Sequence, residues 1–393
     1  MTTKEIFIQP IDVLMLRGNR QFGGGGDWGE ALMPPWPSLF SGAIRSAILS
    51  QRGVDIAKFL SGSEIDSKIR HSLGFPPGGD FGTFRVIKSN IARITSSGVE
   101  RLFHLPADLE VSQSSEKKYV VRYKKPVVIP PSFSMTSART PKVAFTQGGA
   151  GGKGGGSHLL TSAGFEKWRR MEQISENDLL SPSDIYSIES RLGIGLDSDR
   201  RTAQHSLIYT TDAISMEVGY GFLVKVQDSD DLLDDSGLLR LGGDGRGATY
   251  RTVTSTTETP LESSTTGIVP KSARIYLNSP ALFEGGWYPD GSTIYDNGGR
   301  DIVSFEFNSV SSEIIAATSG RHRTVSGWDL SKGEPKESLR SIPSGAVYFL
   351  DNFDGDPGEL SELAESGLWT TDPTSDQRRA EGFNQCEIAF SQS

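Results

Sequence analysis

Residues 38–49 read SLFSGAIRSAIL and give the clearest indication of the architecture of this chain. Apolar residues recur there every three or four positions, which predicts an amphipathic helix with Ser38 as its N-terminal cap. The preceding segment IFIQPIDVLML, residues 6–16, is apolar and β-branched enough to predict a first strand. A strand followed by a helix is the opening of a split β-α-β unit.

Later segments extend this pattern. Strands are predicted near residues 84–94, 102–105, 119–129, 206–211, 219–226, from 248, and near 273–277, 303–308, 314–318 and 346–350. Helices are predicted at 165–174, 181–189 and 230–241. Because strand, helix, strands, helix, strand recurs loosely in both halves, we predict an α+β protein. It would have two ferredoxin-like (RRM-like, split βαβ) domains with long loop insertions, at 1–192 and 193–393.

Composition narrows the class of protein. The chain has 393 residues, 45 of them glycine, and a single cysteine, Cys386, which excludes an intramolecular disulfide framework and fits a reducing cytoplasm. The start MTTKEIFIQP lacks a signal-peptide pattern, and no run approaches the roughly 18 apolar residues of a membrane span. We therefore expect a cytoplasmic protein without a membrane partner. The glycine tract at 147–157 is predicted to be a flexible insertion.

Charge is unevenly distributed along the chain. The formal net charge of −9 argues against a protein that coats nucleic acid indiscriminately. Acidic residues concentrate at 228–235 and 351–365, whereas cations gather elsewhere. This segregation permits a local basic groove.

The segment LRLGGDGRGATY, residues 239–250, is the first candidate for such a groove. Glycine tolerates positive φ and close approach, so the loop can present backbone amides and the Arg246 guanidinium to a polyanion. It is not a nucleotide P-loop, because Ala248 stands where that motif has lysine. A tight turn without a ligand is the alternative interpretation. The candidate residues are Gly242, Gly243, Gly245, Arg246 and Gly247.

Other cations form three groups. Lys118, Arg122 and Lys124 would share one face of the strand at 119–129, where they could follow a phosphate backbone or simply protect a solvated edge strand. Arg200 and Arg201 follow a turn. The segment 320–340, broken by glycine and proline, carries exposed cations that would suit a bent and unstacked RNA, namely Arg321, Arg323, Lys332, Lys336 and Arg340. For these last two groups, surface loops that only maintain solubility are the alternative.

Catalytic and metal-binding patterns are missing from the sequence. The histidines His71, His104, His158, His205 and His322 show no metal-ligand spacing, and there is no G-x-S-x-G motif. An RNA-cleaving ferredoxin-like protein would usually carry a histidine near its first helix for general acid–base catalysis, and residues 17–51 contain none. We predict no catalytic residue, metal or cofactor.

Five segments in the same order resemble a known family. They read DVLMLRGNRQF, PPWPSLFSGAIRSAIL, RLGIGLDSDRRTAQHSLIYTT, LRLGGDGRGATY and GWDLSKGEPKESLRSIPSGAVYFL, and span about residues 11–350. Together they are similar to the third subunit of the CRISPR type III-B effector, the Cmr complex, within the RAMP superfamily. The last segment is the most specific of the five. The tract at 147–157 and the acidic tail match no motif of the family.

The resemblance implies a non-catalytic RNA-binding subunit in antiviral defence. Such a subunit helps hold the 5′ handle of the CRISPR RNA and pairs with the large polymerase-type subunit, beside backbone RAMP subunits that engage target RNA. The handle would meet the loop with Arg17 and Arg20, the helix start from Ser38 to Arg45, Arg200 and Arg201, and the 242–247 loop. Trp28, Trp36, Trp287 and Trp328 are candidate interface aromatics, with core positions as the alternative.

Two other functions stay open at this stage. One is a RAMP-superfamily endoribonuclease that processes precursor CRISPR RNA. The other is a nucleotide-binding enzyme that uses the glycine loop.

Overall fold

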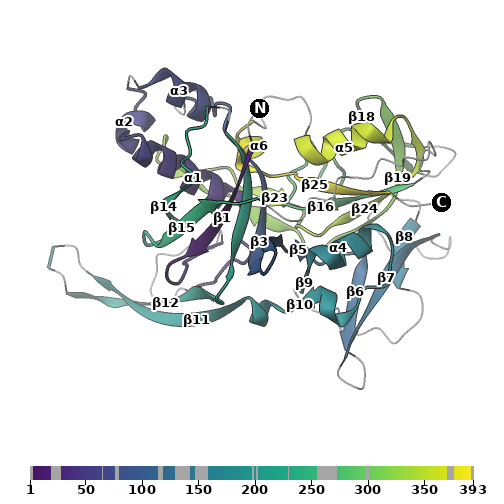
Figure 1. Ribbon diagram of the computed structural model, residues 1–393, viewed down its shortest axis with the longest axis horizontal. Coiled ribbons are helices and arrows are strands. Elements are labelled where there is room, and N and C mark those ends of the chain that lie inside the picture. Colours follow the sequence, from purple (N-terminus) through teal and green to yellow (C-terminus); the bar gives the residue numbers. More distant parts are fainter. Residues whose placement is uncertain are drawn as a thin grey trace.

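A computed structural model describes most of the chain (Figure 1). The described residues are 3–18, 28–63, 65–75, 79–113, 118–128, 142–146, 158–196, 199–200, 202–228, 230–254, 272–296, 301–369 and 376–390. They form a mixed structure of helices and mostly antiparallel sheets, as the α+β prediction requires. The predicted insertion at 147–157 lies outside the described residues.

The first large sheet has six strands in the order β14-β15-β1-β13-β3-β4, and all neighbours are antiparallel. The strands are β1 (Thr3–Pro10), β3 (Arg85–Thr95), β4 (Gly98–Arg101), β13 (Tyr220–Gln227), β14 (Ser236–Arg240) and β15 (Gly247–Thr252). The connection from β1 to β3 carries the helices α1 (Pro37–Gln51), α2 (Ile56–Leu60) and α3 (Ser67–Leu73).

Helix α1 confirms the amphipathic helix expected at 38–49. Its buried face includes Phe40 and Ile44, which join Ile6 and Phe222 of the sheet in one hydrophobic core. The helix begins one residue earlier than predicted. Pro37 occupies the first helical position, where a missing N–H is harmless, so Ser38 is not the cap.

The second large sheet has the order β17-β18-β19-β24-β16-β25, again antiparallel throughout. Its strands are β16 (Ala273–Leu277), β17 (Ser292–Asp296), β18 (Asp301–Phe307), β19 (Val310–Thr318), β24 (Val347–Asp354) and β25 (Cys386–Phe390). Helices α5 (Pro357–Ser366) and α6 (Asp376–Glu381) lie between β24 and β25. Leu360 and Leu363 of α5 pack into the core of this sheet.

Smaller elements surround the two sheets. They are β2 (Trp28–Gly29), β5 (Phe103–His104), β6 (Leu109–Gln113), β7 (Tyr119–Val128), β8 (Lys142–Thr146), β9 (Leu159–Leu160), α4 (Ser162–Arg169), β10 (Leu179–Leu180), β11 (Tyr186–Leu196), β12 (Ala203–Met216), β20 (Arg323–Val325), β21 (Trp328–Asp329), β22 (Glu334–Pro335) and β23 (Leu339–Ser341). Single 3₁₀ turns span Glu176–Asp178 and Pro182–Asp184.

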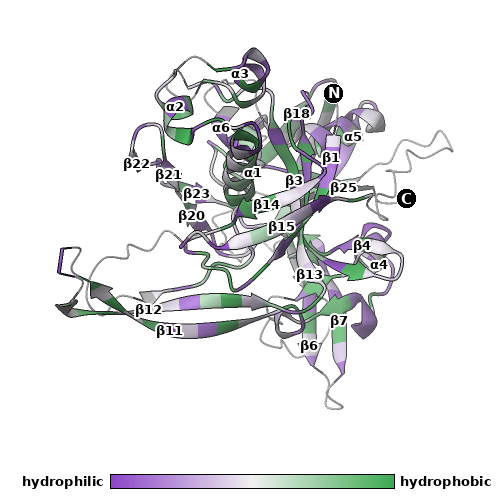
Figure 2. Ribbon diagram, turned by 60° about the vertical axis from the view of Figure 1, so that its left-hand side comes forward, coloured by the Kyte–Doolittle hydropathy of each residue, from purple (hydrophilic) through white to green (hydrophobic). Residues whose placement is uncertain are grey.

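A long ribbon made of β11 and β12 extends beyond the body of the molecule (Figures 1 and 2). Leu192 and Ile194 on β11 are 73% and 55% exposed, which leaves apolar side chains along the ribbon open to solvent. The predicted domain boundary between residues 192 and 193 lies within β11. The first sheet draws strands from both sides of that boundary.

Two predicted helices are wrong. In the segment 230–241, Leu239 is buried and Leu238 is 68% exposed, which is the period-two pattern of a strand, and residues 236–240 form β14. Asp228 accepts a hydrogen bond from the Leu233 backbone and holds the preceding residues in a loop. In the segment 181–189, helical structure stops after the turn at 182–184 and β11 follows.

The remaining helix and strand predictions agree with the structure apart from their ends. The predicted helix at 165–174 is α4, which begins at Ser162 and ends at Arg169. The strand predicted at 6–16 ends at Pro10, which lacks an N–H for the ladder.

Polar contacts join the two sheets. Lys88 on β3 donates to Glu387 on β25 at 2.7 Å, and the Asn90 amide on β3 donates to Asn278 at 2.9 Å. These contacts help to fix the relative position of the two sheets.

Candidate functional site

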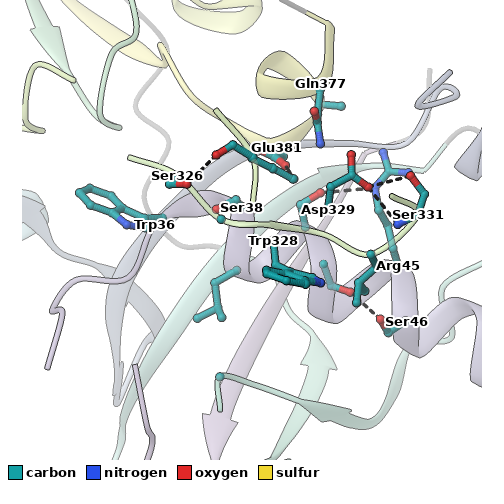
Figure 3. A pocket seen from close by; sticks show the side chains of 18 of the residues that line it. Trp36, Ser38, Arg45, Ser46, Ser326, Trp328, Asp329, Ser331, Gln377 and Glu381 are labelled. Atoms are coloured by element: carbon teal, nitrogen blue, oxygen red, sulfur yellow. Dashed lines mark hydrogen bonds and ion pairs between the residues drawn. The ribbon is translucent and has the colours of Figure 1, made fainter. Parts of the chain in front are cut away.

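A groove of about 810 Å³ lies between helix α1 and the hairpin at 326–336, and is lined by residues from both parts of the chain (Figure 3). One wall contains the start of α1, the segment 15–17 and the glycine turn at 242–244. The facing wall contains the hairpin at 326–336 and one side of α6. A volume of this size accommodates a drug-sized ligand such as one nucleotide.

The glycine turn connects β14 to β15 as a hairpin, not a helix to a strand. Gly242 has a φ of +83°, and a Cβ atom there would lie 2.7 Å from the Met15 carbonyl oxygen. The Gly243 amide donates to that same oxygen at 2.8 Å. Packing against Met15 therefore requires glycine at 242, and Gly242 and Gly243 form part of the groove wall.

Arg246 forms an ion pair with another residue of the same chain. Its Nη1 donates to Asp12 Oδ2 at 2.7 Å, and its side chain is 28% exposed. This ion pair holds the turn against the segment after β1. Gly245, Arg246 and Gly247 do not line the groove.

Arg45 lines the groove but directs its donors into the protein. Its guanidinium donates to the backbone carbonyls of Leu73, Phe81 and Phe84 at 2.8–3.1 Å. Burial lowers the pKa of Arg45 to about 10, so it stays charged at neutral pH. Its contribution to the groove is a fixed positive charge that also anchors the segment from α3 to β3.

The facing hairpin is clamped to α6 by an ionic network. Glu381 accepts from both Lys336 and Arg378, and its side chain is 8% exposed. Arg378 also donates to the backbone carbonyls of Ser326 and Glu337 at 3.3 Å. The two ends of the hairpin are thus held to one helix, and its position is fixed relative to the groove.

The hairpin presents an aromatic ring from β21 and a cation from its turn. Trp328 is 56% exposed and Lys332 is exposed, and both line the groove. Asp329 accepts hydrogen bonds from the Ser331 amide and hydroxyl and from the Lys332 amide, which shapes the turn. Burial opposes ionisation of Asp329, but these hydrogen bonds outweigh it and lower its pKa.

The structure brings five of the predicted site residues together in this groove, namely Arg17, Ser38, Arg45, Gly242 and Gly243. Lys118, Arg122 and Lys124 lie elsewhere, on or beside β7 in the sheet β6-β7-β8. Arg122 donates to the Ser112 hydroxyl, and Lys124 donates to the Ala107 carbonyl. Arg20 and Arg201 lie outside the described residues.

The other predicted cations are also outside this groove. Arg200 is at the tip of the β11–β12 ribbon. Arg321 and Arg323 are exposed at the start of β20, and Arg323 lines a separate cavity of about 140 Å³. Among the candidate aromatics, Trp36 precedes α1 and lines the groove, whereas Trp287 is 50% exposed away from it.

Lys332 and Lys336 belong to the cation-bearing segment 320–340 that the sequence indicates as a possible RNA contact, although neither is among the predicted site residues, and Glu381 is not predicted at all. A signal was available for the two lysines, because both fall in the segment GWDLSKGEPK, the most specific part of the family resemblance. Glu381 has no such signal, since its role depends on contacts with residues distant in sequence.

Metal-binding clusters of three or more His, Cys, Asp or Glu are absent from the residues that the structure describes. Within the same residues, no helix has the length and hydropathy needed to cross a membrane.

Comparisons with known proteins give one family match. Residues 6–389 match the sequence profile of the family described as CRISPR-associated protein (Cas_Cmr3). No curated protein is similar at a significant level.

Solved structures are similar only in outline. A chain in the type III-B Cmr-beta complex bound to cognate target RNA is 13% identical, with 98% of this chain and 96% of that chain covered and a TM-score of 0.49. A chain in the same kind of complex with AMPPnP in state 1 is 14% identical over 96% and 93%, with a TM-score of 0.48.

Proposed function

This chain belongs to the Cas_Cmr3 family of CRISPR-associated proteins, and from this we propose that it is a non-catalytic, RNA-binding subunit of a type III-B CRISPR effector complex. The family match confirms the resemblance drawn from the five sequence segments. In our proposal the subunit holds the 5′ handle of the CRISPR RNA in the groove between α1 and the hairpin at 326–336. It would act in antiviral defence.

One observation carries the proposal. Four of the five segments that resemble the family contribute to the same groove, although they are far apart in sequence. Their contributions are residues 15–17, 35–46, 242–244 and 327–336. The third segment, 191–211, instead forms most of the β11–β12 ribbon.

The chemistry of the groove suits a short single-stranded RNA. Arg17, Arg45 and Lys332 bring positive charge, and the N-terminus of α1 adds the positive end of a helix dipole, with no acidic residue in the first turn. Three acidic residues also line the groove, and two of them, Asp329 and Glu381, are engaged with protein donors, whereas Asp244 adds negative charge at the glycine turn. Phosphate contacts position such an RNA, and contacts to its bases select the sequence.

The alternative of an RNA-processing nuclease lacks here the histidine that such an enzyme would usually use as a general acid or base. Among the described residues that line the groove there is no histidine. We therefore assign positioning of the guide to this subunit and leave catalysis to other members of the complex.

Strand order supports ferredoxin-like units as part of the proposal. The chain passes through four strands of the first sheet in the order β1, β3, β13, β15. Side by side in the sheet they follow the order fourth, first, third, second, which is that of a split β-α-β unit. In the second sheet, β25-β16-β24-β19 repeats that order. In the first sheet, α1 lies in the connection between the first two of its four strands, β1 and β3. In the second sheet, α5 lies in the connection between the last two, β24 and β25.

We further propose the partners that this role requires. The subunit would contact the guide RNA directly, pair with the large polymerase-type subunit and adjoin the backbone RAMP subunits, with target RNA engaged indirectly. A cytoplasmic location remains a prediction from the cysteine content.

Photo-crosslinking tests the proposal. The complex is assembled with guides that carry 4-thiouridine at handle positions, and crosslinked peptides are mapped. We expect crosslinks to residues 34–46, 242–244 or 326–336. Crosslinks confined to other subunits, with guide occupancy unchanged when this chain is left out, would rule out the handle role. Metal-free cleavage of repeat RNA by the purified protein would favour the nuclease.

A further inference from the structure

We propose that the Trp328 indole is a stacking platform for one unpaired nucleobase of the RNA bound in the groove. This inference rests on the proposed RNA-binding function and names the part of the ligand that occupies one wall. According to this inference, the groove contacts the phosphates of the RNA and also holds one of its bases in an unstacked position.

The position of Trp328 is the first reason. Figure 3 shows its indole projecting from the hairpin into the groove, on the side of α1. The side chain is 56% exposed, unlike Trp168, which is fully buried in the core. A large aromatic ring left open inside a groove offers area to a ligand, because every base has a face that can stack on it.

The rigidity of the platform is the second reason. β21 and β22 are only two residues each, yet the hairpin is closed by a bond from the Lys336 amide to Gly327 O at 2.9 Å. The clamp of Lys336 and Arg378 on Glu381 then fixes the hairpin to α6. A platform that is already ordered loses little conformational entropy when a ligand binds.

The charges around Trp328 favour a nucleotide over an apolar protein segment. Lys332 extends from the same hairpin, and Arg17 and Arg45 lie on the facing wall. These cations place positive charge near the phosphates on either side of a base stacked on the indole, Arg45 by its charge alone because its donors point into the protein. Leu330, which is 64% exposed near the ring, adds apolar area but no charge.

Fluorescent guides provide the test. Complexes are assembled with guide RNAs that carry 2-aminopurine at one handle position at a time, because stacking quenches its fluorescence. With the native chain we expect one quenched position, and with Trp328→Ala we expect that signal to rise several-fold at that position alone. Trp328→Phe should keep part of the quenching. Release of a handle-length RNA should become about 5- to 100-fold faster with Trp328→Ala, the range that loss of one stacked base implies.

Trp287→Ala is the matched control, since that tryptophan is similarly exposed but lies outside the groove, and it should change nothing. Equal fluorescence in native and Trp328→Ala complexes at every handle position, with the guide still bound, overturns the stacking proposal alone. Loss of a protein subunit from the Trp328→Ala complex without a fluorescence change overturns it in favour of a protein contact. Native complexes in which no handle position crosslinks to this chain would overturn the proposed function itself.

Discussion

The Arg274 guanidinium donates a hydrogen bond to Asp108 Oδ2 at 2.9 Å in the interior of the protein. The two side chains are only 3% and 1% exposed. The other Asp108 oxygen accepts from the Trp168 indole at 2.8 Å, and the guanidinium lies 4.2 Å from the centre of that ring. This cluster joins β16 of the second sheet to α4 and to the loop before β6.

Replacement of Arg274 by methionine should strongly destabilise the protein. The change leaves the Asp108 carboxylate buried without its cation, which typically costs about 3–5 kcal/mol. Urea unfolding measures the loss. Arg191→Met is the control, because its pair with Glu189 is exposed and should contribute at most about 1 kcal/mol. Equal losses for the two variants would contradict the role of the buried pair.

Alanine at Gly242 should destabilise the protein more than alanine at Gly245. Both residues have positive φ, which costs an L-residue about 1–2 kcal/mol. Only at 242 would the new Cβ atom also meet the Met15 carbonyl and the Leu16 side chain, at 2.7 and 2.9 Å. The additional overpacking should cost about 1–3 kcal/mol, seen as a lower urea midpoint. Equal midpoints would show that the loop shifts freely.

Arg246 does not line the groove, so alanine at this position tests whether the guide RNA continues past the glycine turn, and we expect it to weaken retention of the guide in the assembled complex. If Arg246 reaches a phosphate, its loss lowers the slope of log affinity against log salt concentration by about 1. Asp12→Ala separates this role from a structural one, since it breaks the same ion pair but leaves the cation in place. We expect Asp12→Ala to retain the guide. Equal weakening by both variants would mean that Arg246 only braces the turn.

Stability should fall in mildly acidic solution because of His104. Burial, helped by the charge of Arg323, lowers the pKa of His104 from 6.5 to about 4. Below pH 6.5 the unfolded chain therefore binds a proton at His104, whereas the folded protein binds it only below about pH 4. The stability difference should therefore be absent above pH 7 and grow as the pH falls, to about 3 kcal/mol near pH 4.

His104→Gln provides the comparison for this pH effect. The residue lines a second cavity of about 350 Å³, so glutamine can replace it without entering the core. Thermal unfolding at pH 7 and pH 4.5 should show a smaller acid loss for the variant than for the native protein. An identical loss in both proteins would assign the acid sensitivity to other groups.

Local sequence patterns were sufficient for most helices and strands. The spacing of Phe40, Ile44 and Ile48 predicts α1 because the pattern is complete within one element. The segment 230–241 was misassigned because its leucines and acidic residues suit either structure. Pairing of β14 with β15 and the bond from Leu233 to Asp228 select the strand and the loop. Those partners are not visible in a local window.

The family and the identity of its motifs come from the amino-acid order alone, because each motif is continuous in the chain. The groove cannot be predicted from the amino-acid order alone. Its walls meet only after the two sheets pack against each other through contacts such as Lys88 with Glu387. The state of each cation also depends on folding. Arg246 pairs with Asp12, which is 234 residues away in sequence, and Arg45 donates to three backbone carbonyls. Such ion pairs and hydrogen bonds form between residues that are neighbours in space rather than in sequence.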